Sequence, residues 1–295
     1  MISDEALESL CAIGSKGFFP LLPEAAPTIA DYLINAIRDA IPTSLIRVGD
    51  GEGNALGVIA APRHPANLES FNHKFISQNG LEIGEDEAFA FCQMIRDALV
   101  SADIIGFRSC DRTILRSELA QISGNVEHGR FMPALGMTYA RELLRAELVD
   151  GAYRDKIVTS AWIHLWLIPH LSRIMDAAES IIVITGQAEL EDQFKSRLGR
   201  RLRSFLRIPV EGYRPKSRDD SHFHTVFPRI VDLLHTDLRG TLVLVGAGFF
   251  GKIYSQTARD SGAVAIDLGS GFDLLAGKET RPVHSNFAIQ MLRWL

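Results

Sequence analysis

The chain has 295 residues, of which 46% are hydrophobic and 23% charged, and its formal net charge is −5. This composition is ordinary for a globular protein and excludes a disordered or low-complexity chain. Three widely spaced cysteines argue against a disulfide framework. No apolar run reaches the roughly 18 residues of a membrane span. Because the first residues are acidic, we expect no signal peptide and a cytoplasmic protein.

The first half of the sequence alternates between helix and strand patterns. The predicted elements begin with a helix over 23–40, a strand over 44–48 and a helix over 85–100. A strand over 102–107, helical segments around 112–122 and 138–149, and a strand over 155–161 follow. The first strand stops at a glycine-rich turn. The stretch 60–80 has the least regular pattern, and we expect it to be an active-site loop.

The second half is more regular, because short runs of β-branched residues are followed by amphipathic segments. We expect strands over 180–186, 206–212, 241–246 and 263–269, and helices over 188–198, 224–234 and 249–262. Strands that are apolar throughout are typical of a mostly parallel sheet with helices on both faces. The sequence therefore predicts one Rossmann-like α/β domain over 43–295, with an N-terminal helical extension over 1–42 packed on it.

The charge is unevenly distributed along the chain. Residues 195–218 contain nine lysines or arginines against one acid, which indicates either an anionic partner or a solvated helix face. The anionic partner would be a phosphate-bearing small molecule or an anionic membrane surface. Binding to a membrane surface would make the protein peripheral to the inner membrane. Nucleic acid is not expected, because it usually requires a whole basic domain.

A glycine pattern typical of phosphate-binding turns follows one predicted strand. Gly246, Gly248 and Gly251 lie between the strand 241–246 and the next helix. Glycines there allow a tight turn, and the helix N-terminus offers backbone N–H groups to a phosphate. Asp267 ends the next strand, as the acidic residue of a dinucleotide site would. The residues after Gly251 are too few for the rest of a usual dinucleotide-binding domain, so the pattern indicates a phosphate site more than an NAD site. The alternative interpretation is a glycine turn used only for packing.

A second glycine-rich segment carries two carboxylates directly after the first predicted strand. Asp50 and Glu52 are one residue apart, next to Gly49 and Gly51. Carboxylate oxygens are ligands that Mg²⁺ and Mn²⁺ accept together with phosphate oxygens, and open α/β sheets bind ligands at the carboxyl ends of their strands. The segment therefore predicts a metal–phosphate site, with Arg47 as a phosphate ligand or as a partner of the acids.

The stretch IRVGDGEGNALG resembles the Arg-x-Gly-Asp-Gly-Glu signature of the GT-D-fold glycosyltransferases, a family first described as a domain of unknown function. The likeness continues, in order, through ITGQAELEDQF, EGYRP and TLVLVGAGFFGKIYSQTARDSGAVAIDLGSGFDLLAGKETRP, and it covers roughly residues 40–282. The sequence departs from the family pattern at Val48, where an aromatic residue is frequent, and at His224, where proline is expected. The resemblance implies a GT-D-type α/β fold.

That family uses its two carboxylates to hold a divalent metal and the diphosphate of a nucleotide sugar, and the resemblance implies this role for Asp50 and Glu52. It implies a transferase with Mn²⁺ or Mg²⁺, a nucleotide-sugar donor such as a UDP-sugar, and a saccharide or lipid-linked acceptor in polysaccharide or glycoconjugate synthesis. Candidate cations for the diphosphate are Arg47, Arg214 and Lys252, and candidate catalytic bases are Asp267, Asp273 and His222.

Two other functions stay open on the sequence alone. An NAD(P)-dependent oxidoreductase would use the glycine turn and Asp267, and it would leave the Asp-Gly-Glu segment without a role. A non-catalytic nucleotide-binding scaffold of a polysaccharide assembly would use the basic stretch 195–218 to dock on a partner or a membrane.

Overall fold

The computed structural model describes residues 26–60, 65–107 and 156–281, together with 136–137, 139–140, 142–144, 146–147, 151 and 284. Its strands lie in the order β3 (Ile157–Ser160), β2 (Ile104–Phe107), β1 (Thr43–Val48), β7 (Val264–Asp267), β6 (Thr241–Gly246), β4 (Ser180–Thr185) and β5 (Leu202–Arg207). The pairings with a described register are parallel. The predicted parallel α/β fold is confirmed. The chain divides into two compact units: the first holds the described residues of 46–77 and 81–161, and the second those of 22–45, 78–80 and 162–295.

The first unit is built on the end of β1 (Thr43–Val48) and on two short buried strands. Its other elements are, in chain order, α3 (Asp50–Ala60), α4 (Pro65–Asn79, of which residues up to Ser77 belong here), α5 (Glu85–Ser101), β2 (Ile104–Phe107) and β3 (Ile157–Ser160). β2 and β3 are buried at every position. α5 packs on α3. The buried face of α5 includes Cys92, and burial raises the pKa of its thiol.

Two segments of this unit differ from the prediction. The expected loop over 60–80 is helix α4 over most of its length, with 61–64 outside the described residues. Phe71 and Phe75 lie one helical turn apart there and are fully buried, so they supply the apolar face of the helix. The expected turn after β1 is the first turn of α3, which begins at Asp50 itself.

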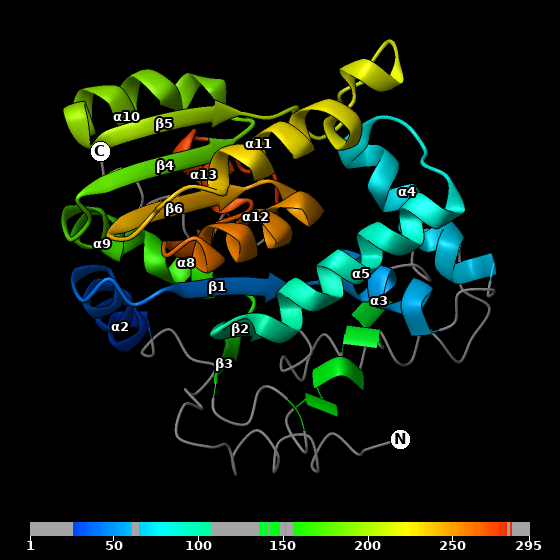
Figure 1. Cartoon of the computed structure of the whole chain (residues 1–295), viewed down its shortest axis with the longest axis horizontal. Helices are drawn as coiled ribbons and strands as arrows, with labels where there is room; N and C mark the ends of the chain where they lie inside the picture. The colour runs from blue at the N-terminus through cyan, green and yellow to red at the C-terminus, as the bar shows by residue number, and fades with distance from the viewer. Residues whose placement is uncertain are drawn as a thin grey trace. The chain divides into compact units, whose positions relative to one another are not determined.

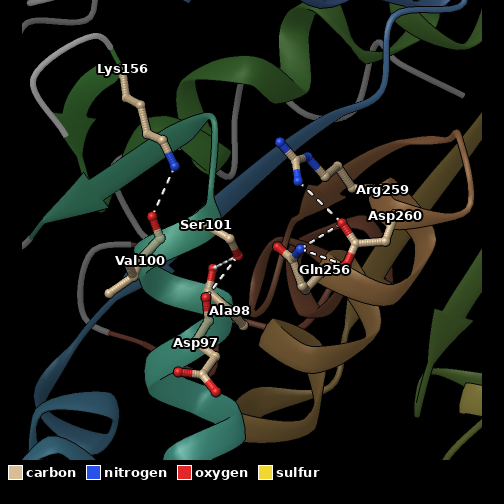
Figure 2. Close-up of polar contacts among 8 residues, drawn as sticks. All are labelled: Asp97, Ala98, Val100, Ser101, Lys156, Gln256, Arg259 and Asp260. Carbon is tan, nitrogen blue, oxygen red and sulfur yellow. Dashed lines mark hydrogen bonds and ion pairs between the residues drawn. The ribbon is translucent and has the colours of Figure 1, made fainter. Parts of the chain in front are cut away.

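The carboxyl end of α5 is held by side chains that satisfy its last carbonyls. The Lys156 ammonium donates to the carbonyl of Val100 at 2.8 Å, and the Ser101 hydroxyl lies within hydrogen-bond distance of the carbonyls of Asp97 and Ala98 (Figure 2). The last carbonyls of a helix have no partner within it, and a nearby cation is favourable there. The contact ties the residue before β3 to the end of α5.

The second unit contains the larger part of the sheet. Its helices are α2 (Ala26–Arg38), α8 (Ile163–Leu167), α9 (Leu171–Asp176), α10 (Glu191–Leu198), α11 (Phe227–Leu234), α12 (Gly248–Asp260) and α13 (Gly271–Leu275). Its strands are the start of β1, β4 (Ser180–Thr185), β5 (Leu202–Arg207), β6 (Thr241–Gly246) and β7 (Val264–Asp267). Shorter turns are η3 (Ile168–His170), η4 (Ala188–Leu190), η5 (Gly199–Arg201), η6 (Arg218–Asp220) and the π-helical η7 (His222–Val226).

The central strands of this unit are covered on both faces. β4, β6 and β7 are buried at nearly every position, which parallel strands achieve only when helices lie on both sides of the sheet. α11 and α12 pack together, and α12 lies on β6 (Figure 1). α12 also packs on β7. α2, α8 and α9 form another packed group. At the end of α12, the Gln256 amide and the Arg259 guanidinium both bond the Asp260 carboxylate (Figure 2).

Strand β5 lies earlier in the sequence than predicted. The apolar pattern places a strand over 206–212, whereas β5 covers Leu202–Arg207. β5 is the last strand in the sheet order, and its residues are half-buried or exposed. An edge strand needs no continuous apolar run. Because β5 contains arginines and a serine, it lacks the apolar pattern from which buried strands are predicted. Pro209 has no N–H to donate to the ladder, and the strand ends before it.

Candidate functional site

The Asp-Gly-Glu segment begins helix α3 in the first unit. Asp50 is the first residue of the helix and is half-buried, and Glu52 is 9% exposed. The Glu52 carboxylate accepts a hydrogen bond of 2.8 Å from Gly49 N–H, which is the reach-back of a helix capping box. Arg47 on β1 donates to the carbonyl of Ala161 at 3.4 Å. The start of α3 therefore orients Glu52 by a backbone bond.

The glycines of α3 allow two backbones to come into direct contact. Gly51 and Gly53 are buried near the start of the helix, and a Cβ at Gly53 would collide with the carbonyl of Gly136. A Cβ at Gly136 would in turn collide with the carbonyl of Asp50 and would lie 2.7 Å from the amide oxygen of Asn54. Close packing thus explains the glycine at position 53, where a phosphate-binding turn is not formed.

The oxygens of Asp50 and Glu52 fit a divalent metal by their chemistry. Mg²⁺ is commonly held by one or two carboxylates, with phosphates and waters completing its shell. Residues two apart on a regular helix point in different directions, so a shared ion requires Glu52 to turn back toward the helix start, as its bond to Gly49 makes it do. Within the described residues, no group of three or more His, Cys, Asp or Glu side chains could hold a metal, so an ion held by Asp50 and Glu52 would need further oxygens from other groups.

The second unit contains the glycine turn after β6. Next to it, the connections that follow β4 and β6 run in opposite directions along the sheet. β4 and β6 are neighbours in the sheet, yet the chain leaves β4 through α10 toward β5 and leaves β6 through α12 toward β7, on opposite sides. Parallel α/β sheets bind ligands at the carboxyl ends of the strands at such a switch point. Thr185 and Gly246 are register partners, so the two loops that follow them start side by side.

The glycine turn is occupied by a side chain of the protein itself. Gly248 has a φ of +53°, and a Cβ there would collide with the amide of Gln78. The oxygen of this amide accepts a hydrogen bond of 2.8 Å from Phe249 N–H at the start of α12. Gly246 and Gly251 also lie against neighbouring side chains. In this conformation the turn accommodates protein groups, including an amide oxygen where the sequence predicts a phosphate oxygen.

Lys252 and Asp267 form an ion pair with each other. Lys252 lies on α12 and is 3% exposed, and Asp267 ends β7 and is 1% exposed. A carboxylate buried against an ammonium does not present its oxygens to a ribose or to a sugar hydroxyl, which argues against the dinucleotide interpretation. The pair joins the first turns of α12 to the end of β7. Their roles as phosphate ligand and catalytic base stay predictions.

His222 is also buried in the second unit. It is 1% exposed, its ring stacks on Phe250 with centroids 3.8 Å apart, and Nε2 lies 3.0 Å from the hydroxyl of Tyr254 in a hydrogen bond. Burial lowers the pKa of His222 to about 3, because the protonated ring is poorly solvated there. The imidazole is therefore neutral at pH 7 and a weak base, and its role as catalytic base stays a prediction.

The basic stretch 195–218 is partly neutralised within the second unit. Its ion pairs include Lys195–Glu191, Arg207–Glu191 and Arg201–Asp176. Arg214, a predicted diphosphate ligand, is exposed and donates to the carbonyl of Tyr213 at 3.3 Å. These pairs favour the solvated-surface interpretation over an anionic partner. Of the helices that the structure describes, none has the length and apolar character needed to cross a bilayer.

A polar network after β4 was missed by the sequence analysis. The Gln187 amide donates to Asp273 at 2.6 Å and accepts from the Lys278 ammonium at 2.6 Å. Lys278 also pairs with Glu189, and Asp273 also accepts from the Thr280 hydroxyl. The network gives each oxygen of Asp273, the third candidate base, a hydrogen-bond donor from the protein. The segment ITGQ, which ends at Gln187, is the sequence signal that points to it.

Comparisons with known proteins concern most of the chain. The model of the GT-D fold-like domain family matches residues 25–275. A search of the curated proteins gave no significant match. One similar solved structure is a selenomethionine-substituted domain of unknown function 1792, with 14% identity and a TM-score of 0.44 over 94% of this chain and 87% of that chain. Another solved structure is described by the statement that the highly conserved domain of unknown function 1792 has a distinct glycosyltransferase fold. Its identity to this chain is 16% and its TM-score 0.45, over 94% of this chain and 87% of that chain.

Proposed function

Because the chain belongs to the family of GT-D fold-like domains, we propose that it is a glycosyltransferase that depends on a divalent metal. Its donor is a nucleotide-diphosphate sugar, with UDP-sugars as the first candidates, and its acceptor is a saccharide or a lipid-linked sugar in the synthesis of a polysaccharide or glycoconjugate. Family membership supports a glycosyltransferase in general. The observation that supports metal dependence is the pair of carboxylates at the start of α3.

Asp50 and Glu52 are the residues that would hold the metal. A carboxylate offers about four lone-pair sites, so the bond from Gly49 N–H orients Glu52 and does not exhaust it as a ligand. When bound, Mn²⁺ or Mg²⁺ would offset the negative charge of the departing nucleoside diphosphate. The positive end of α3 favours the same anion, and Arg47, three residues before Asp50, adds a positive charge to the segment.

The candidate bases of the second unit are all engaged by protein partners. Asp267 is paired with Lys252, Asp273 is held by Gln187 and Thr280, and His222 is buried against aromatic rings. We therefore assign no catalytic base among them. Likewise, a phosphate at the glycine turn would have to replace the bond between Gln78 and Phe249 N–H.

Thermal-shift measurements test the proposed function against its alternatives. We expect UDP to raise the melting temperature when Mn²⁺ is present and to raise it little when it is absent. Stabilisation by NAD(H) without a metal would instead indicate an oxidoreductase, and stabilisation by neither ligand would indicate a scaffold. A screen for Mn²⁺-dependent hydrolysis of nucleotide sugars then identifies the donor, since many donors are slowly hydrolysed when no acceptor is present.

A further inference from the structure

Asn54 is a buried polar residue whose amide oxygen the packing of α3 leaves unsatisfied. The residue is 3% exposed, and in the part of the chain that the structure describes its Oδ1 has no hydrogen-bond partner. Leaving a buried acceptor without a donor is costly in free energy. An unsatisfied buried oxygen in a native protein therefore calls for a specific explanation, such as a bound ion or an ordered water.

Asn54 lies on the same face of α3 as Asp50. The two residues are four positions apart, and helical side chains lean toward the N-terminus, over the preceding turn. A Cβ at Gly136 would meet both the backbone carbonyl of Asp50 and Asn54 Oδ1, so both oxygens lie against Gly136. The lean of the side chain places the amide oxygen over the first turn of α3, which contains Asp50 and Glu52.

We propose that the amide oxygen of Asn54 is a neutral ligand of the divalent cation held by Asp50 and Glu52. Amide carbonyls are hard oxygen donors of the kind that Ca²⁺ and similar cations accept beside carboxylates. The alternative is that the oxygen accepts only a weak Cα–H contact from Gly136, which would make Asn54 purely structural. The inference rests on the proposed function, because it adds a third oxygen to the same metal centre.

The test is Mn²⁺ binding to the protein without nucleotide, measured by the EPR signal of free Mn²⁺, and the melting temperature with and without Mn²⁺. Asn54→Ala removes the oxygen, so we expect Mn²⁺ affinity to fall about tenfold and the metal-free melting temperature to stay near that of the wild type. Asn54→Asp adds a charge beside Asp50. We expect it to lower the metal-free melting temperature and to enlarge the rise that Mn²⁺ produces.

Asn67→Ala is the matched control. Asn67 is a buried asparagine of the same unit, and its amide donates to the carbonyl of Gly57 at 2.9 Å and to the hydroxyl of Tyr139 at 3.1 Å. Losing these bonds should lower the melting temperature equally with and without Mn²⁺. Asn54 variants that behave like this control, or that do not fold, overturn the proposal and make Asn54 structural.

Asp50→Asn separates the failure of this inference from the failure of the proposed function. If Asp50→Asn abolishes Mn²⁺ binding while Asn54→Ala leaves the affinity unchanged, the metal centre stands and the role of Asn54 is wrong. If the wild-type protein does not bind Mn²⁺, or if Asp50→Asn binds it as well as the wild type does, the metal centre itself is wrong, and the role of Asn54 with it.

Discussion

The buried ion pair of Lys252 and Asp267 should contribute to the stability of the second unit only as long as both charges are present. Lys252→Met leaves the Asp267 carboxylate buried without its cation, so we expect the free energy of unfolding to fall by about 3–5 kcal/mol. The double variant Lys252→Met, Asp267→Leu removes both charges and should recover most of that loss. Urea unfolding measures both effects. A Lys252→Met protein as stable as the wild type would show that the ion pair does not persist in solution.

His222 should make stability depend on pH. Its pKa is about 3 in the folded protein and about 6.5 in an unfolded chain. Below pH 6.5 the unfolded state binds a proton that the folded state does not, so this contribution to stability is complete above that pH and is lost as the pH falls toward 3. At pH 5 the expected loss is about 2 kcal/mol relative to pH 7.

Urea unfolding of the wild type and of His222→Gln at pH 7 and pH 5 isolates this contribution. The glutamine can still bond the Tyr254 hydroxyl, but it does not titrate. We expect the wild type to lose more stability than the variant between the two pH values. Equal losses in both proteins would mean that His222 is accessible to protons in the folded state.

At the residue scale, sequence reasoning could locate Asp50 and Glu52 but could not foresee how other charged residues are used. The two acids stand out in the sequence because they follow an apolar strand directly, and their role as metal ligands stays a prediction. The pairing of Lys252 with Asp267, and the burial of His222 against Phe250, depend on contacts between elements far apart in sequence. A local pattern does not contain such contacts. The burial of Asn54 is not predictable from a local pattern either, since its side chain lies against Gly136, far along the chain.

At the scale of elements, the contact between α3 and Gly136 should be intolerant of any side chain. Gly53→Ala would place a methyl group against the backbone carbonyl of Gly136, which cannot move aside as a side chain could. We expect a loss of about 1–3 kcal/mol or more in the free energy of unfolding.

Gly84→Ala is the control for this prediction. Gly84 precedes α5 in the same unit, and a Cβ there would lie at an ordinary 3.6 Å from the nearest atom, an oxygen of Glu87. It should change stability by about 0.5 kcal/mol or less. If both variants unfold at the same urea concentration, the backbone contact of Gly53 is not formed.

The regular elements were predictable because their apolar periodicity is strong. The strands over 241–246 and 263–269 and the helix between them match β6, β7 and α12 closely. The prediction was wrong where burial is partial or where glycines occur. β5 is a half-exposed edge strand, and the glycines that suggested a loop after β1 instead permit close packing of α3.

At the scale of the whole molecule, the net charge of −5 and the internal ion pairs argue against binding to an anionic membrane. We expect little co-sedimentation with anionic vesicles even at low salt, where the attraction of exposed charges reaches furthest. Strong sedimentation that is lost at high salt, and that is weakened by replacing Arg200 and Lys216 with Glu, would instead show that the basic stretch 195–218 binds the membrane surface.

The parallel α/β architecture follows from the alternation of buried strands and amphipathic helices, and it was predictable from the sequence. The division into two compact units was not, because the chain shows no linker or change in composition at 45–46 or at 161–162. The contacts that define the units join segments far apart in sequence, such as the Gln78–Gly80 segment and the residues of the second unit. Such contacts leave no local pattern.

The central claim is that Asp50 and Glu52 bind a divalent metal together with a nucleoside diphosphate. Calorimetric titration of UDP, with and without Mn²⁺, into the wild type, Asp50→Asn and Glu52→Gln tests it most directly. Glutamine at 52 can still accept the bond from Gly49 N–H, so the start of α3 should persist while the charge is lost. We expect Mn²⁺ to strengthen UDP binding in the wild type, and we expect each variant, folded by circular dichroism, to lose this gain. UDP binding with Mn²⁺ that is the same in all three proteins would contradict it.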